Sequence, residues 1–290
     1  MQYTYSIIIP YRDIYDLLVK AVASIPDRED IQIIIVDNSN KPMDEKKIPH
    51  KEKAMVCYTT SEPGQGGGRA RNVGLKQVQG THILFLDADD SFTEGAFDSF
   101  DEEVDSLSDI VFYKADSIKL KTGEQSRRHC MVNSFVDDYL KTGCEDLPRY
   151  RYVNPICKLY KAPFVLENGF QFDEVKVSND FMFSVRTGHF AKQISAVDKV
   201  VYMITEGEKN SSLTKARTAE NQFIRYKVAV SYCKFVEEVG RRDMYFHLLS
   251  YVVHALKDFG PKEFVKYVRY ARKNKVNIFY GFSLSKIFKK

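Results

Sequence analysis

The stretch HILFLDADD, from His82 to Asp90, decides the fold class of this 290-residue chain. It opens with an apolar run that lacks polar alternation, which predicts a strand buried on both faces. Two earlier runs have the same character, SIIIP at residues 6–10 and IQIIIVD at residues 31–37. Buried strands separated by helices are typical of a parallel sheet covered on both sides. The chain is therefore predicted to be an α/β protein.

Helices are predicted between these strands. Residues 13–24 carry apolar side chains at helical spacing with Asp13 as the expected N-cap, and a second helix is expected from about Arg69 to Val78. Further strands are expected near residues 55–59 and at residues 109–113. Strands and helices are therefore expected to alternate along the first hundred residues.

Polar residues follow three of the predicted strands. Pro10, Asp37 and Asp87 each stand at the carboxyl end of one of them. Ligands of such sheets bind beyond the carboxyl ends of the strands. We therefore expect the three residues to face one crevice.

Composition excludes several protein classes. Apolar residues make up 44% of the chain and charged residues 28%, which is typical of a globular protein and not of a disordered or fibrous one. The five cysteines form no CxxC pair, which argues against a disulfide framework or a zinc site and favours a reducing cytosol. The start MQYTYSIIIPYRD lacks the features of a signal peptide, and no apolar run approaches the about 20 residues of a membrane span. Secreted and integral-membrane proteins are thus not expected.

The charge is unevenly distributed. Residues 215–290 carry 17 Lys and Arg against 6 acidic residues, whereas the preceding residues carry 26 against 33. The tail has apolar stripes at helical spacing, and Pro261 suits the start of a helix. Residues 257–290 mix basic and aromatic residues, which leaves two interpretations open: contact with an anionic membrane surface, or helices that pack on the protein and expose lysines. No nucleic-acid recognition motif is present, so no nucleic-acid partner is expected.

The acidic cluster after the third strand predicts a metal site. In an extended segment Asp87 and Asp89 point to the same side while Ala88 turns away. Such close carboxylates repel one another unless a cation lies between them, and hard oxygen ligands suit Mg²⁺ or Mn²⁺. Asp90 alone is better interpreted as the N-cap of a helix from Thr93 onward.

A glycine-rich segment, GGGRARNVG at residues 66–74, precedes and opens a predicted helix. Glycines in this position let backbone N–H groups approach an anion. The segment is neither a dinucleotide fingerprint nor a P-loop, and a flexible loop is the alternative. Arg71 can reach a phosphate or a base from the helix, whereas Arg69 is expected at the surface.

In this order the motifs SIIIP, IIVDNS, GRARNVG and FLDADD resemble the family 2 glycosyltransferases of the GT-A fold, of the kind that builds bacterial polysaccharides. The resemblance is close over residues 5–100 and fainter through residues 157–160, 170–174, 179–180 and 210–214. It implies a Rossmann-like, mainly parallel sheet flanked by helices, here with a helical C-terminal extension.

The resemblance implies an inverting, hexosyltransferase-like enzyme that takes a sugar from a nucleotide diphosphate, usually UDP, with Mg²⁺ or Mn²⁺ as cofactor. The residues implied at the nucleotide and the metal are Pro10 and Tyr11 beside the nucleoside, Asp37 at the uracil, Arg71 on the nucleotide, Asp87 at the ribose or phosphate, and Asp89 on the metal. A divalent cation suits a diphosphate leaving group because it stabilises the charge that builds there.

Inversion also requires a base for the acceptor hydroxyl. The family pattern supplies it as the Asp of a Glu-Asp pair, which implies Asp180 here, with Asn179 in place of the usual Glu. A second interpretation, which does not exclude the first, is that Asp180 or a neighbour caps a helix over residues 181–191.

We therefore expect residues 1–109 to form the nucleotide-sugar-binding half, residues 110–214 the acceptor-binding half, and residues 215–290 a basic helical region. The acceptor is expected to be a glycan or a lipid-linked molecule, and the location cytoplasmic, at the inner face of the membrane. A nucleotidyltransferase and a non-catalytic nucleotide-sugar-binding protein are the alternatives.

Overall fold

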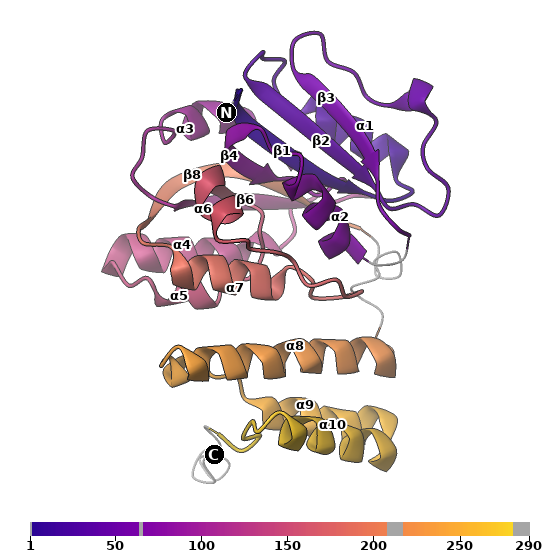
Figure 1. Cartoon of the computed structure of the whole chain (residues 1–290), viewed down its shortest axis with the longest axis vertical. Coiled ribbons are helices and arrows are strands. Elements are labelled where there is room, and N and C mark those ends of the chain that lie inside the picture. The colour runs from indigo at the N-terminus through magenta and orange to yellow at the C-terminus, as the bar shows by residue number, and fades with distance from the viewer. Residues whose placement is uncertain (1, 64–65, 208–216, 281–290) are drawn as a thin grey trace. The chain divides into compact units, whose positions relative to one another are not determined.

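The computed structural model describes residues 2–63, 66–207 and 217–280 (Figure 1). The chain divides into two compact units, Met1–Ser212 and Leu213–Lys290. Each unit is described separately below.

The first unit contains a sheet of eight strands within the described residues, in the order β3-β2-β1-β4-β7-β6-β8-β5. Only β5 and β7 run antiparallel to their neighbours. The predicted mainly parallel α/β sheet is thus confirmed. The strands are β1 (Tyr3–Tyr11), β2 (Ile31–Asp37), β3 (Met55–Thr60), β4 (Gly80–Phe85), β5 (Ser91–Phe92), β6 (Ile110–Lys119), β7 (Lys158–Lys161) and β8 (Ile194–Glu206).

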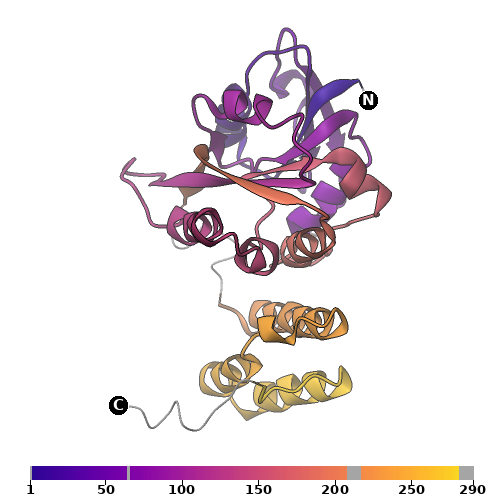
Figure 2. The ribbon, with the colours of Figure 1, turned by 90° about the vertical axis from the view of Figure 1, so that its left-hand side faces the viewer.

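Helices flank this sheet. Those named α4, α5 and α7 lie together beside β6 and β8, as Figure 2 shows. The isoleucines of β1 and β2 are fully buried, as expected for strands that are covered on both faces. The helices of the first unit are α1 (Tyr15–Ala23), α2 (Gly66–Leu75), α3 (Ala96–Asp101), α4 (His129–Thr142), α5 (Asp146–Tyr150), α6 (Ala162–Glu167) and α7 (Phe181–Phe190).

Three local predictions were wrong. Strand β1 does not end at Pro10 but continues to Tyr11. Its pairing with β4 ends before the proline, so no hydrogen bond of the sheet requires the N–H that proline lacks. Asp13 does not cap α1: the N-cap is Ile14, and the N–H of Asp13, at φ 53°, donates to Ser39 Oγ. Helix α2 begins at Gly66 and not near Arg69, because its glycines are part of the helix.

The second unit contains the helices α8 (Ala219–Glu238), α9 (Leu248–Phe259) and α10 (Pro261–Lys273), which pack against one another. Pro261 opens α10 as predicted. The rings of Tyr226 and Tyr267 stack with their centroids 4.5 Å apart, which joins α8 to α10. Over the described ranges, every helix is too short or too polar to cross a membrane.

Candidate active site

Three carboxylates meet just beyond the end of β4. One carboxylate oxygen each of Asp87, Asp89 and Asp90 lies within 4.8 Å of the others. Ala88 is buried while Asp89 is exposed, so the chain turns its small residue inward and this carboxylate outward. The predicted convergence of Asp87 and Asp89 is present in the structure, and Asp90 joins them.

Asp90 is not a helix cap, contrary to the sequence-based interpretation. Its buried carboxylate accepts a hydrogen bond of 2.7 Å from the N–H of Thr205 in β8, and α3 begins only after Gly95. Burial raises the pKa of Asp90 well above its usual value, and the carboxylates of Asp89 and Asp87 raise it further. This residue therefore fixes β8 to the acidic loop.

The carboxylate oxygens of the cluster are suitable ligands for a hard divalent cation. Although Asp89 reaches solvent, the atoms packed around its carboxylate partly desolvate it, and this together with the charge of Asp87 raises the pKa of Asp89 to about 6. Asp87 uses Oδ1 for an ion pair with Arg71, which leaves its second oxygen available. Oxygen ligands from two carboxylates, completed by water or phosphate, are what Mg²⁺ and Mn²⁺ use in proteins.

Arg71 connects the acidic loop to the start of α7. It lies in the second turn of α2, where its Nη2 is 2.5 Å from Asp87 Oδ1 and its Nη1 donates to Asn179 Oδ1 at 3.1 Å. Its buried Nε has no hydrogen-bond partner. Burial would lower the pKa of Arg71, but Asp87 and Asp180 outweigh it and keep the guanidinium charged. An orphaned donor on a buried cation is costly and points to a missing acceptor.

Helix α2 is held against the segment before α7. Asn72 exchanges two hydrogen bonds with the backbone of Phe172, at 2.8 and 3.0 Å. The position of Gly68 admits no side chain, since a Cβ there would lie 2.2 Å from the carbonyl oxygen of Asp173. The GGGRARN motif thus sets the distance between α2 and the residues that lead to Asp180.

Asp180 occupies the N-cap position of α7, but its side chain makes no capping hydrogen bond. Burial raises the pKa of Asp180, while the charges of Arg71 and Lys158 oppose the rise. The carboxylate is thus close enough to Arg71 and Asp87 for electrostatic interaction, and it is not used to cap the helix. Asn179, in place of the usual Glu, binds Arg71 through its amide oxygen.

The remaining predicted residues lie at the ends of β1 and β2, where Tyr11 pairs with Asp37. Asp37 is 1% exposed, and it accepts hydrogen bonds from the N–H groups of Ser39 and Met43 and from the hydroxyl of Tyr58. Burial alone would raise the pKa of Asp37, but these hydrogen bonds lower it below its usual value. Its oxygens therefore order the loop after β2.

Two residues were missed by the sequence analysis. The hydroxyl of the fully buried Tyr202 accepts from the N–H of Asp87 at 3.0 Å and hydrogen-bonds Asp90. Lys158 is also buried, and its Nζ donates to the carbonyl of Tyr152 at 2.7 Å. Burial lowers the pKa of Lys158 to about 7, although Cys157 and Asp180 act against this. The segment 210–214, compared above with a family motif, lies outside the described residues.

The comparisons with known proteins agree with this geometry. The sequence model of glycosyl transferase family 2 matches residues 6–167. The chain is 25% identical over 269 residues to the minor teichoic acid biosynthesis protein GgaB of Bacillus subtilis, covering 88% of this chain and 29% of that protein. It is 24% identical over 219 residues to the poly(ribitol-phosphate) beta-N-acetylglucosaminyltransferase TarS of Staphylococcus aureus, covering 72% of this chain and 37% of TarS. The chain thus spans about a third of the length of these curated relatives.

Solved structures share the fold. The structure of S. aureus TarS 1–349 in complex with UDP-GlcNAc matches with a TM-score of 0.69 at 18% identity, covering 93% of this chain and 81% of that one. The UDP complex of the same protein matches with a TM-score of 0.57 at 20% identity, covering 88% and 72%. The GT-A fold predicted from the motifs is thereby confirmed.

Proposed function

The chain belongs to glycosyl transferase family 2 and is a glycosyltransferase, and from this premise we propose that it transfers a sugar from a UDP-sugar to a glycan or lipid-linked hydroxyl with inversion. The observation that carries the proposal is the acidic cluster Asp87–Asp90 with Arg71 and Asp180 around it. It combines a cation site, a buried positive charge and an unengaged carboxylate.

In this proposal residues 1–109 bind the donor and residues 110–214 the acceptor. Pro10 and Tyr11 lie against the nucleoside, and Asp37 faces the uracil while it orders the loop after β2. Arg71 turns its orphaned Nε and its charge toward the nucleotide. The UDP-GlcNAc and UDP found with TarS support a uridine nucleotide as the donor class.

Asp89 would hold Mg²⁺ or Mn²⁺, with Asp87 beside it at the ribose or phosphate. The cation, when bound, stabilises the negative charge of the UDP leaving group. Asp90 stays with β8, because its carboxylate is occupied by Thr205 and Tyr202. The charge of Arg71 adds to the attraction for a diphosphate.

Asp180 would act as the base. It accepts the proton of the acceptor hydroxyl as the hydroxyl oxygen forms the new bond to the anomeric carbon and the bond to UDP breaks. A carboxylate free of capping hydrogen bonds, with its pKa raised by burial, is suited to take that proton. The nearby charge of Arg71 opposes this rise and so favours the ionised form of Asp180.

The acceptor is proposed to belong to the polyol-phosphate wall polymers or their lipid-linked precursors, by analogy with the printed functions of GgaB and TarS. Four basic residues of α10 lie along one groove that suits an anionic polymer or an anionic membrane surface at the cytoplasmic face: Lys262, Lys266, Arg269 and Lys273. The last part of the basic stretch 257–290 lies outside the described residues.

The test is product identity. The purified chain is incubated with UDP-glucose, UDP-galactose and UDP-N-acetylglucosamine, with Mn²⁺ and with poly(ribitol phosphate) or poly(glycerol phosphate). We expect release of UDP that depends on both acceptor and metal, with a sugar added to the polymer. A parallel incubation replaces the UDP-sugars with UTP and the corresponding sugar 1-phosphates. Release of pyrophosphate there would identify a nucleotidyltransferase, and UDP binding without turnover on any acceptor would favour a non-catalytic protein; either result contradicts the proposal.

A further inference from the structure

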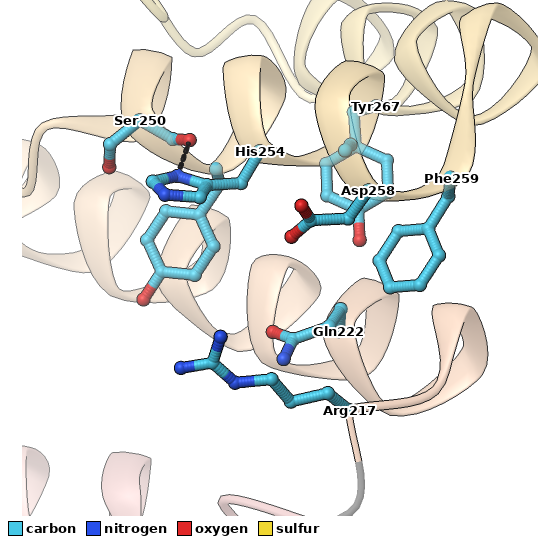
Figure 3. A pocket seen from close by; sticks show the side chains of 9 residues that line it. Arg217, Gln222, Ser250, His254, Asp258, Phe259 and Tyr267 are labelled. Carbon is cyan, nitrogen blue, oxygen red and sulfur yellow. Dashed lines mark hydrogen bonds between the residues drawn. The ribbon is translucent and has the colours of Figure 1, made fainter.

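The helical unit contains a cavity of its own. About 330 Å³ in volume, it lies between the start of α8, the length of α9 and Tyr267 of α10 (Figure 3). This is at the lower end of the about 300–1,000 Å³ that small-molecule sites occupy. Its walls combine the aromatic rings of Tyr251, Phe259 and Tyr267 with the polar side chains of Arg217, Gln222, Ser250, His254 and Asp258.

One polar group at the bottom of the cavity lacks a partner. Tyr267 is 1% exposed, and its hydroxyl is buried without any hydrogen bond. Figure 3 shows this side chain and Asp258 pointing from their helices toward α8. A buried hydroxyl left unpaired destabilises the fold, because it has lost its hydrogen bonds to water without replacement. The Tyr267 hydroxyl is therefore the buried polar group beside the cavity that a hydrogen-bonding ligand would satisfy.

The walls offer unpaired acceptors as well as donors. Asp258 is exposed to solvent at the cavity, and within the described part of the chain its carboxylate makes no ion pair or hydrogen bond with protein groups. The ring Nδ1 of His254 lies 2.7 Å from the carbonyl oxygen of Ser250 and must donate to it, which leaves Nε2 for another partner.

The donors come from the opposite side. Arg217, just before α8, and Gln222, in its first turn, lie beside each other along the start of α8 in Figure 3, below the side chains of α9. Arg217 can only donate, whereas the Gln222 amide can both donate and accept. A ligand in the cavity would therefore meet hydrogen-bond donors on the α8 side and acceptors on the α9 side.

This mixture selects the class of ligand. An anion would meet Asp258, and a cation would meet Arg217, so neither is favoured throughout the cavity. A neutral polyhydroxylated molecule has hydroxyls that donate and accept at once, and its C–H faces pack on aromatic rings. Sugars and sugar alcohols are the molecules with this chemistry.

We propose that the cavity bounded by Arg217, Gln222, His254, Asp258 and Tyr267 binds one uncharged sugar or polyol moiety of the acceptor polymer or its product, with the phosphate groups of the polymer outside the cavity. The inference rests on the proposed function, since it deepens the acceptor class named there. All residues that line this cavity belong to the helical unit, whereas the acidic cluster at the end of β4 belongs to the first unit. A second point of attachment of this kind would hold the polymer between transfers.

Saturation-transfer NMR and calorimetric titration of the full chain test the proposal, with methyl β-glucoside, methyl N-acetyl-β-glucosaminide and ribitol as probes. Excess UDP and Mn²⁺ occupy the donor site throughout. We expect saturable binding of at least one probe, weakened tenfold or more in Asp258→Asn and in Tyr267→Phe. Glu238→Gln, which removes an exposed acidic charge from the far end of α8, serves as the control and keeps the wild-type affinity.

The Tyr267→Phe variant separates binding from folding. Because the lost hydroxyl has no partner, this variant should melt at the same temperature as the wild type or higher. The proposal is overturned if no probe binds saturably, if both variants bind as the wild type does, or if inorganic phosphate binds in preference to the probes. Probe binding by a protein that never releases UDP would refute the proposed function and leave this site standing.

Discussion

At the scale of single residues, the three acidic side chains after β4 have different surroundings. Asp87 is paired with Arg71 and Asp90 is bonded to β8, whereas Asp89 is exposed and is not needed to hold the loop. The neighbours of Asp87 and Asp90 are therefore structural partners, and Asp89 is the carboxylate that we propose for the cation.

Asp89→Asn should abolish the contribution of Mn²⁺ to UDP affinity and lower transfer at least about 100-fold, because a stabilising charge at the leaving group is lost. The melting temperature should not change. Titration with UDP in Mn²⁺ and in EDTA measures the first effect, with Asp98→Asn, an exposed acid on α3, as the matched control. Unchanged metal-dependent affinity in Asp89→Asn would remove Asp89 from the metal site.

The buried amine of Lys158 makes stability depend on pH. Its pKa of about 7 in the folded chain lies below the about 10.4 of an exposed lysine. Between these values the unfolded chain binds more protons, so the free energy of unfolding rises with pH from about 7 upward. Urea unfolding between pH 6.5 and 9.5 should show this rise in the wild type and in Lys141→Met on α4, and a smaller one in Lys158→Met. Equal slopes in all three would contradict the assignment.

At the scale of elements, the contact between α2 and the segment leading into α7 places the proposed base. A Cβ on Gly68 would lie 2.2 Å from the carbonyl oxygen of Asp173 and 2.8 Å from the Cβ of Asn179. Neither atom can move aside without a shift of the backbone. Gly68→Ala should therefore destabilise the fold by about 1–3 kcal/mol and reduce transfer. At Gly67 the nearest atom to the added carbon is Arg71 Nη1 at 3.0 Å, at the end of a side chain and not in the backbone, so Gly67→Ala should cost less stability than Gly68→Ala. Thermal unfolding of the two variants tests this, and equal melting temperatures would refute the contact.

The sequence predicts elements where one periodicity dominates. The unbroken apolar runs of β1, β2 and β4 indicate a parallel sheet, and the strand ends indicate where Asp87 and Asp89 lie. The start of α2 is less predictable, because glycine is a poor helix former and only the close approach of residues 173–179 explains its presence there. Asp13 resembles a cap by residue type, but its backbone is turned to Ser39.

The contacts of the site that come from distant strands have no local signal. Tyr202 alternates with apolar neighbours in β8 as any strand residue does, and only the sheet order brings it to Asp87 and Asp90. Lys158 is a lysine in a short strand, where composition predicts exposure. Its burial follows from the packing of Phe112 and Tyr152 against it.

At the scale of the whole molecule, the residues assigned to donor and base all precede residue 212, whereas the sugar-sized cavity lies in the helical unit. A chain ending at Ser212 should therefore bind UDP within about twofold of the full chain, since it keeps every proposed nucleotide contact. Its elongation of a long polymer should fall more than its transfer to a short acceptor. Calorimetry and product-length analysis measure the two effects, and a tenfold loss of UDP affinity would show that the helical unit contributes to the donor site.

In the proposed mechanism Asp180 accepts the proton of the acceptor hydroxyl, whereas other residues bind the nucleotide-sugar. Asp180→Asn retains the size of the side chain and disturbs no capping hydrogen bond, but an amide does not accept that proton. The decisive measurement is UDP-sugar affinity and turnover on one preparation of this variant, with Asp173→Asn alongside. We predict wild-type affinity with transfer reduced by about 10²–10⁴-fold in Asp180→Asn only. Near-normal turnover in Asp180→Asn would contradict the claim and move the base to another residue.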